Sequence, residues 1–75
     1  MLKKDLQELS SFDNYRIYIR KIGINYMIEM QKIDMKQYPE MPNYAREEDK
    51  NLRKAVKKLN SRMEDIWFNN MIGSS

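Results

Sequence analysis

The chain has 75 residues, with 14 Lys plus Arg against 11 Asp plus Glu, and its formal net charge is +3. A chain of this length buries only about 60% of its unfolded surface and supports one hydrophobic core, which excludes a second domain. The absence of Cys and His excludes disulfides, thiolate chemistry and the commonest general base and metal ligand. We therefore expect one domain over residues 1–75, with no catalytic residues, no cofactor and no bound metal.

Composition also bears on location and origin. No apolar run approaches the ~18–20 residues needed to cross a bilayer, so no membrane span is expected. The basic start at Lys3 and Lys4 has no apolar run behind it, so it is not a secretory signal, and a cytoplasmic protein is expected. Ile, Lys, Asn and Met are plentiful while Ala and Val are scarce, which is typical of AT-rich coding and indicates a phage or another mobile element.

The first residues predict a short helix over 2–9, because Leu2, Leu6 and Leu9 form a small apolar ridge at helical spacing. Ser10 and Asp13 then have the serine-x-x-acid spacing that is seen at helix starts. A second helix is therefore expected to begin at about Phe12.

This first long helix is predicted over 12–37, and a β-strand over part of the segment is the alternative. Helical spacing runs along one side of the segment through Phe12, Tyr15, Ile19, Ile22, Tyr26, Met30 and Ile33. The stretch 22–28 also alternates as a strand would, and Ile is β-branched. We favour the helix because no turn residues stand where a hairpin would need them.

Pro39 and Pro42 predict a loop over 38–43, because each lacks a backbone donor and disfavours helix before it. A second long helix is predicted over about 43–70 from one apolar stripe, formed by Ala45, Leu52, Val56, Leu59, Met63, Ile66 and Trp67. Residues 71–75 are expected to form a frayed tail. The predicted fold class is all-α: an antiparallel helical hairpin with a short N-terminal helix, assembling as a bundle.

A helix over 12–37 would be apolar on two sides, because Ile17, Ile24, Ile28 and Met35 would fall opposite the first stripe. One partner helix covers one side only, and each large side chain left in water forgoes ~1.5–3 kcal/mol relative to its burial. Three partners could bury this second apolar side: the folded-back segment 2–9, a second copy of the chain in a homodimer, or a different protein.

The predicted second helix carries basic residues on one side. Arg46, Lys50, Arg53 and Lys57 follow spacings of four, three and four, and Lys54 adjoins them. Like charges one turn apart destabilise a helix slightly, so the pattern suggests an anionic target. The alternatives are a solvated lysine-rich face, an acidic protein surface and a nucleic-acid backbone.

These patterns favour a small non-enzymatic interaction protein, which binds and modulates a larger protein and has no small-molecule substrate. Its candidate partner-binding residues are Ile17, Ile24, Ile28, Met35, Arg46, Lys50, Arg53, Lys54 and Lys57. The alternative is a nucleic-acid-binding regulator that uses the basic face of the second long helix.

Overall fold

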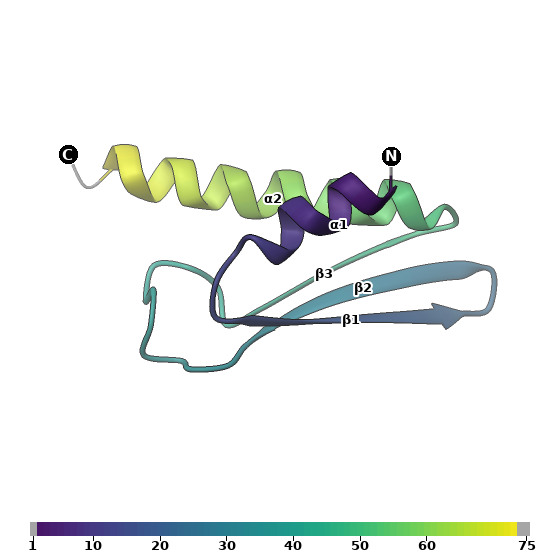
Figure 1. Ribbon diagram of the computed structural model, residues 1–75, viewed down its shortest axis with the longest axis horizontal. Helices are drawn as coiled ribbons and strands as arrows, with labels where there is room; N and C mark the ends of the chain where they lie inside the picture. The colour runs from purple at the N-terminus through teal and green to yellow at the C-terminus, as the bar shows by residue number, and fades with distance from the viewer. Residues whose placement is uncertain (1, 74–75) are drawn as a thin grey trace.

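The computed structural model describes residues 2–73 and contains two helices and three strands. In chain order they are α1 (Leu2–Ser10), β1 (Tyr15–Ile22), β2 (Asn25–Lys32), β3 (Tyr44–Asp49) and α2 (Leu52–Gly73). The strands form one antiparallel sheet in the order β1-β2-β3, and both helices lie over the same face of it (Figure 1). The fold is therefore α+β, and the predicted all-α helical hairpin is wrong.

The predicted helix over 12–37 is replaced by a β-hairpin. Ile22 pairs with Asn25, so Gly23 and Ile24 alone make the turn between β1 and β2. Gly23 has φ +60°, a conformation that glycine adopts without the steric cost of a side chain. A glycine at the first turn position suits a type II′ turn, whose twist matches that of the flanking strands. The expectation that no turn residue stands in this segment is therefore wrong, because Gly23 is one.

The hydrophobic core lies between the sheet and the helices. Met30 of β2 pairs with Ile17 of β1 and Ala45 of β3, and these side chains point toward α2. Leu9 of α1 and Leu59 of α2 are fully buried against them. The side chain of Leu2, the first residue of the predicted N-terminal ridge, lies outside the part of the chain whose side chains are described. Among the residues whose side chains are described, the buried cluster is Leu9, Ile28, Met30, Met41, Ala45, Ala55, Val56, Leu59 and Met63.

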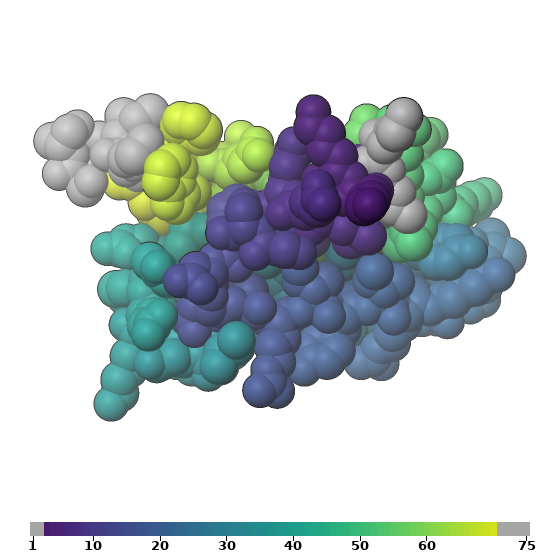
Figure 2. All heavy atoms as spheres, in the orientation of Figure 1, coloured from purple at the N-terminus to yellow at the C-terminus, as the bar shows by residue number. Residues whose placement is uncertain are grey.

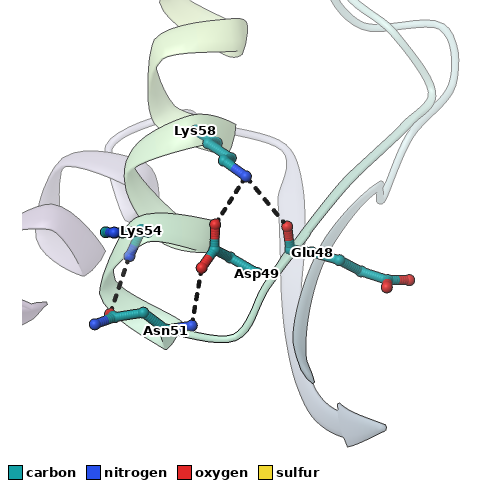
Figure 3. A network of polar contacts seen from close by, with 5 residues as sticks. All are labelled: Glu48, Asp49, Asn51, Lys54 and Lys58. Atoms are coloured by element: carbon teal, nitrogen blue, oxygen red, sulfur yellow. Dashed lines mark hydrogen bonds and ion pairs between the residues drawn. The ribbon is translucent and has the colours of Figure 1, made fainter. Parts of the chain in front are cut away.

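The helix predicted from residue 43 begins at Leu52, because residues 44–49 pair with β2 as a strand. Asn51 caps the helix: its Oδ1 accepts a hydrogen bond from the backbone N–H of Lys54 at 3.3 Å (Figure 3). Within the helix, the predicted stripe packs against the core from Leu52 to Ile66, but its last member, Trp67, is exposed. α2 extends to Gly73, and residues 74 and 75 of the predicted tail lie outside the described residues.

The proline-containing connection runs from β2 to β3 over 33–43 and is held by a buried lysine. The Lys32 Nζ donates to the carbonyl oxygens of Tyr38 at 2.6 Å and Met41 at 2.9 Å. Tyr15 adds a hydrogen bond from its hydroxyl to the carbonyl of Pro42 at 2.6 Å. These contacts fix the loop at the end of the sheet that lies beside the C-terminal half of α2, where the Asn70 amide donates to the Glu40 carbonyl.

Candidate nucleic-acid interface

The four apolar residues predicted to share a partner-binding face are separated in the structure. Ile28 is fully buried in β2, and Ile17 is partly buried against the core from β1. Ile24 lies in the hairpin turn with 71% of its surface exposed, and Met35 is exposed in the loop after β2. The predicted face required helical periodicity, so it disappears when the segment pairs as strands.

The five predicted basic residues divide into two groups. Lys50, Arg53, Lys54 and Lys57 lie together at the β3–α2 junction and on the first turns of α2, and all four are exposed. Arg46 belongs to β3, where it pairs with Glu29 on the sheet face that the helices leave open. Its predicted helical alignment with Lys50 is therefore wrong.

Other chain segments bring more positive charge to the same end of the molecule. Arg53 Nε lies 4.0 Å from Asp5 Oδ2, which places the start of α1 beside the start of α2. Tyr26 pairs with both Lys21 and Asp49, so the tip of the β1–β2 hairpin also reaches this end. Figures 1 and 2 show the start of α2 and the hairpin at one end of the long axis. We call this surface the basic end, and it comprises Lys3, Lys4, Lys21, Lys50, Arg53, Lys54 and Lys57.

Two acidic residues beside the basic end, Asp49 and Asp5, have cationic neighbours, whereas Glu48 is exposed. Asp49 accepts a hydrogen bond from Lys58 Nζ at 2.8 Å and another from the Asn51 backbone N–H at 2.9 Å (Figure 3). The Lys58 contact and then the Asn51 bond hold the pKa of Asp49 below its ordinary value, while Asp49 raises the pKa of Lys58. Asp5 is buried beside Arg53. Among residues 2–73, no ion pair involves Lys50, Lys54 or Lys57.

The opposite end of the molecule has the reverse balance of charge. Asp13, Asp34 and Glu40 are exposed there around the 33–43 loop, and Lys36 is the cation among them. Asn14 fixes this loop to the start of β1 through two hydrogen bonds with Asp34, one in each direction. The protein is therefore polarised, and an anion approaching it is drawn toward the basic end.

The open sheet face forms a second polar surface. Alternate strand residues point away from the helices, so their charged and aromatic groups meet there instead of in the core. Tyr18, Glu29 and Arg46 form one row across the three strands. The residues of the open sheet face are Arg16, Tyr18, Arg20, Ile22, Asn25, Met27, Glu29, Gln31, Tyr44, Arg46 and Glu48.

Glu29 organises the centre of this face. It is only 4% exposed, and its Oε2 accepts a hydrogen bond from the Tyr44 hydroxyl at 2.6 Å. Arg20 Nη2 lies 3.2 Å from Oε1, but Oε1 has no aligned hydrogen-bond donor, so this contact is an ion pair alone. The hydrogen bond to Glu29 is the main cause of a raised Tyr44 pKa. None of the residues of the open sheet face except Arg46 was predicted as a site residue, and the sequence signal for this face is the alternation of Arg16, Tyr18 and Arg20.

Three searches of the described residues and of known proteins found no match. Over residues 2–73, no group of three or more Asp and Glu side chains is placed to hold a metal ion. No helix in the same range is long and apolar enough to cross a membrane. No protein family, curated protein or solved structure matches this chain.

Proposed function

We propose that this protein binds nucleic acid through its phosphate backbone, which contacts the basic end. The observation that carries the proposal is the convergence of cationic side chains from α1, the β1–β2 hairpin and α2 on one surface. A linear array of phosphates is the natural target of such a surface, because each neutralised phosphate releases a condensed counterion. Lys50, Lys54 and Lys57 have no ion-pair partner among the described residues, so their charge is available.

The junction between β3 and α2 gives this surface a fixed shape. Asn51 caps the helix, and Lys58 joins α2 to β3 through Asp49 and through the carbonyl of Glu48 at 3.4 Å (Figure 3). These contacts set the direction in which the first turns of α2 project. Arg53, Lys54 and Lys57 therefore project from a fixed helix start and not from a loop, which lowers the ordering cost of binding.

The structure weakens the argument for an apolar protein partner. That interpretation depended on Ile17, Ile24, Ile28 and Met35 forming one exposed face, and Ile28 is part of the core. The basic residues, by contrast, stay together on the surface after the correction of the fold. An acidic protein surface is the competing target, and it becomes one outcome of the test.

The test is a direct binding measurement with a charge-reversed variant. A short labelled duplex and a short labelled single strand of mixed sequence are titrated with protein at about 50 mM salt, and fluorescence anisotropy is recorded. The variant carries Lys54→Glu and Lys57→Glu, and the control carries Lys36→Glu at the opposite end. All three substituted lysines are exposed, so circular dichroism should show an unchanged fold.

We expect the wild-type protein and the Lys36→Glu control to bind alike, and the double variant to bind at least tenfold more weakly. If the wild-type protein binds neither nucleic acid at low salt, the result would contradict the proposal and favour an acidic protein target. Equal binding by the double variant would show that the basic end is not the contact surface.

A further inference from the structure

We infer that the open sheet face takes a single-stranded segment of nucleic acid, with bases stacking on Tyr18 and Tyr44 and phosphates binding Arg16, Arg20 and Arg46. This inference rests on the proposed function and names the form of nucleic acid that the protein prefers. Single strands offer unpaired bases with free π-faces, whereas the bases of a duplex are stacked on one another.

The two tyrosines are presented to solvent by the outer strands. Tyr18 of β1 is 41% exposed and Tyr44 of β3 is 45% exposed. Tyr18 lies opposite Glu29, and Tyr44 lies opposite Gln31, so the tyrosines occupy adjacent same-face rows on either side of β2. With strands about 4.8 Å apart, their Cα atoms are separated by roughly 12 Å. Neighbouring bases that stay stacked are about 3.4 Å apart, which is much less than the separation of the two tyrosines. A single strand whose bases are splayed apart can place one base on each tyrosine.

Glu29 orders two side chains of this surface in the absence of a ligand. Its buried carboxylate holds the Tyr44 hydroxyl at 2.6 Å and the Arg20 guanidinium at 3.2 Å. The Tyr44 ring is thus fixed over the centre of the sheet. A ring that is already ordered loses less entropy when a base stacks on it. Arg46 reaches the Met27 sulfur at 3.8 Å, so it too is positioned by the face.

The charges of the face favour this ligand over a second copy of the chain. Arg16, Arg20 and Arg46 are exposed there, and Glu48 is the exposed acid among them. A two-fold contact between two such faces would bring arginines from both copies together, and like charges across an interface are unfavourable. The face reaches the same end of the molecule as the basic end, because Arg20 and Glu48 are the neighbours of Lys21 and Asp49 along β1 and β3, although neighbouring strand residues point to opposite sides of the sheet. The cations of the basic end therefore lie beyond the sheet edge at this end of the face.

The experiment compares a double variant, Tyr18→Ala with Tyr44→Ala, against a control, Tyr38→Ala, in which an equally exposed tyrosine is removed from the 33–43 loop. Anisotropy titrations use the same labelled single strand and duplex. We expect single-strand affinity to fall by about 10-fold or more in the double variant, since one stacked base is worth roughly 1–3 kcal/mol. Duplex affinity should stay within twofold, and Tyr18→Phe alone should keep single-strand affinity because it keeps the ring.

Each other outcome identifies which claim fails. Unchanged single-strand binding by the double variant overturns the inference while the proposed function stands. Equal losses for single strand and duplex also overturn it, because the face would then make no distinction between them. If the wild-type protein binds neither nucleic acid, the proposed function fails and the inference fails with it.

Discussion

Tyr44 and Glu29 are joined across the open sheet face by a hydrogen bond of 2.6 Å from the phenolic hydroxyl to Oε2. Arg20 approaches the other oxygen of the same carboxylate from β1 at 3.2 Å. One buried acid on the middle strand therefore links both outer strands, on the side of the sheet that no helix covers. The Tyr44 ring and the Arg20 guanidinium are held in place by that link.

Ionisation of Tyr44 should report on this contact. The protonated hydroxyl donates to Glu29, and the nearby carboxylate disfavours a phenolate, so the pKa of Tyr44 lies above its ordinary value of 10.0. A raised pKa in the folded state means that the stabilisation is present below pH 10 and is lost as the pH rises through the folded value. The difference in ultraviolet absorbance between the wild-type protein and Tyr44→Phe isolates this titration. Glu29→Gln should lower the Tyr44 pKa, and no change on that substitution would contradict the assignment.

The Asp49–Lys58 pair should make stability depend on pH at both extremes. The pKa of Asp49 is lowered, so its stabilisation is present above pH 3.8 and disappears as the pH falls through the folded value. The pKa of Lys58 is raised, so its contribution is present below pH 10.5 and disappears as the pH rises through the folded value. Asp49→Asn should lower the thermal midpoint at neutral pH and make it less sensitive to acid. Asp65→Asn, at an exposed helix position, is the control, and equal effects of both substitutions would refute this prediction.

Truncation of Ile28 and Ile24 distinguishes the sheet from the predicted helix. Ile28 is fully buried between the sheet and α2, so Ile28→Ala should cost about 2–5 kcal/mol in the free energy of unfolding. Ile24 is exposed in the turn, so Ile24→Ala should change this free energy by no more than about 0.5 kcal/mol. Urea unfolding of both variants measures the difference. Similar costs at the two positions would mean that they share a surface, as the helical interpretation required.

Lys32 should control the order of the 33–43 loop. Its ammonium group is buried and donates to two loop carbonyls, and Lys32→Ala leaves both acceptors without that donor. Hydrogen bonds from a charged group are worth about 1.5–3 kcal/mol, so the loop should open more often and be cleaved faster in limited proteolysis. Lys36→Ala, in the same loop but exposed, should leave the cleavage rate unchanged. Faster cleavage in both variants would show that the effect is not specific to Lys32.

The α2 helix could be predicted from the sequence, whereas the pattern over 12–37 was compatible with both a helix and strands, for a physical reason. Helical spacing correctly marked Leu52, Val56 and Leu59 as one buried stripe, since packing of that stripe is local to α2. Tyr15 and Ile19, or Tyr26 and Met30, are four residues apart, and residues so spaced share a face in a strand as well as in a helix. The pattern over 12–37 therefore fitted both structures, and Gly23 was the residue that could have decided between them.

β3 and the open sheet face depend on contacts that are distant in the sequence. The strand reads Tyr-Ala-Arg-Glu-Glu-Asp, which lacks the β-branched residues that mark strands, and it pairs because the edge of β2 is available. Glu29 and Tyr44 are brought together by the same pairing. The basic residues of α2 were identified from local spacing, whereas their neighbours Lys3 and Lys21 reach the basic end only through the tertiary fold.

The salt dependence of binding tests the central claim most directly. Anisotropy titrations of duplex at several salt concentrations give the slope of log affinity against log salt for the wild-type protein and for Lys54→Glu with Lys57→Glu. If Lys50, Arg53, Lys54 and Lys57 each neutralise a phosphate, the wild-type slope should be about −3.6, and the double variant should have a slope smaller in magnitude by about 2. A slope near zero, or an identical slope in the two proteins, would contradict phosphate binding at the basic end.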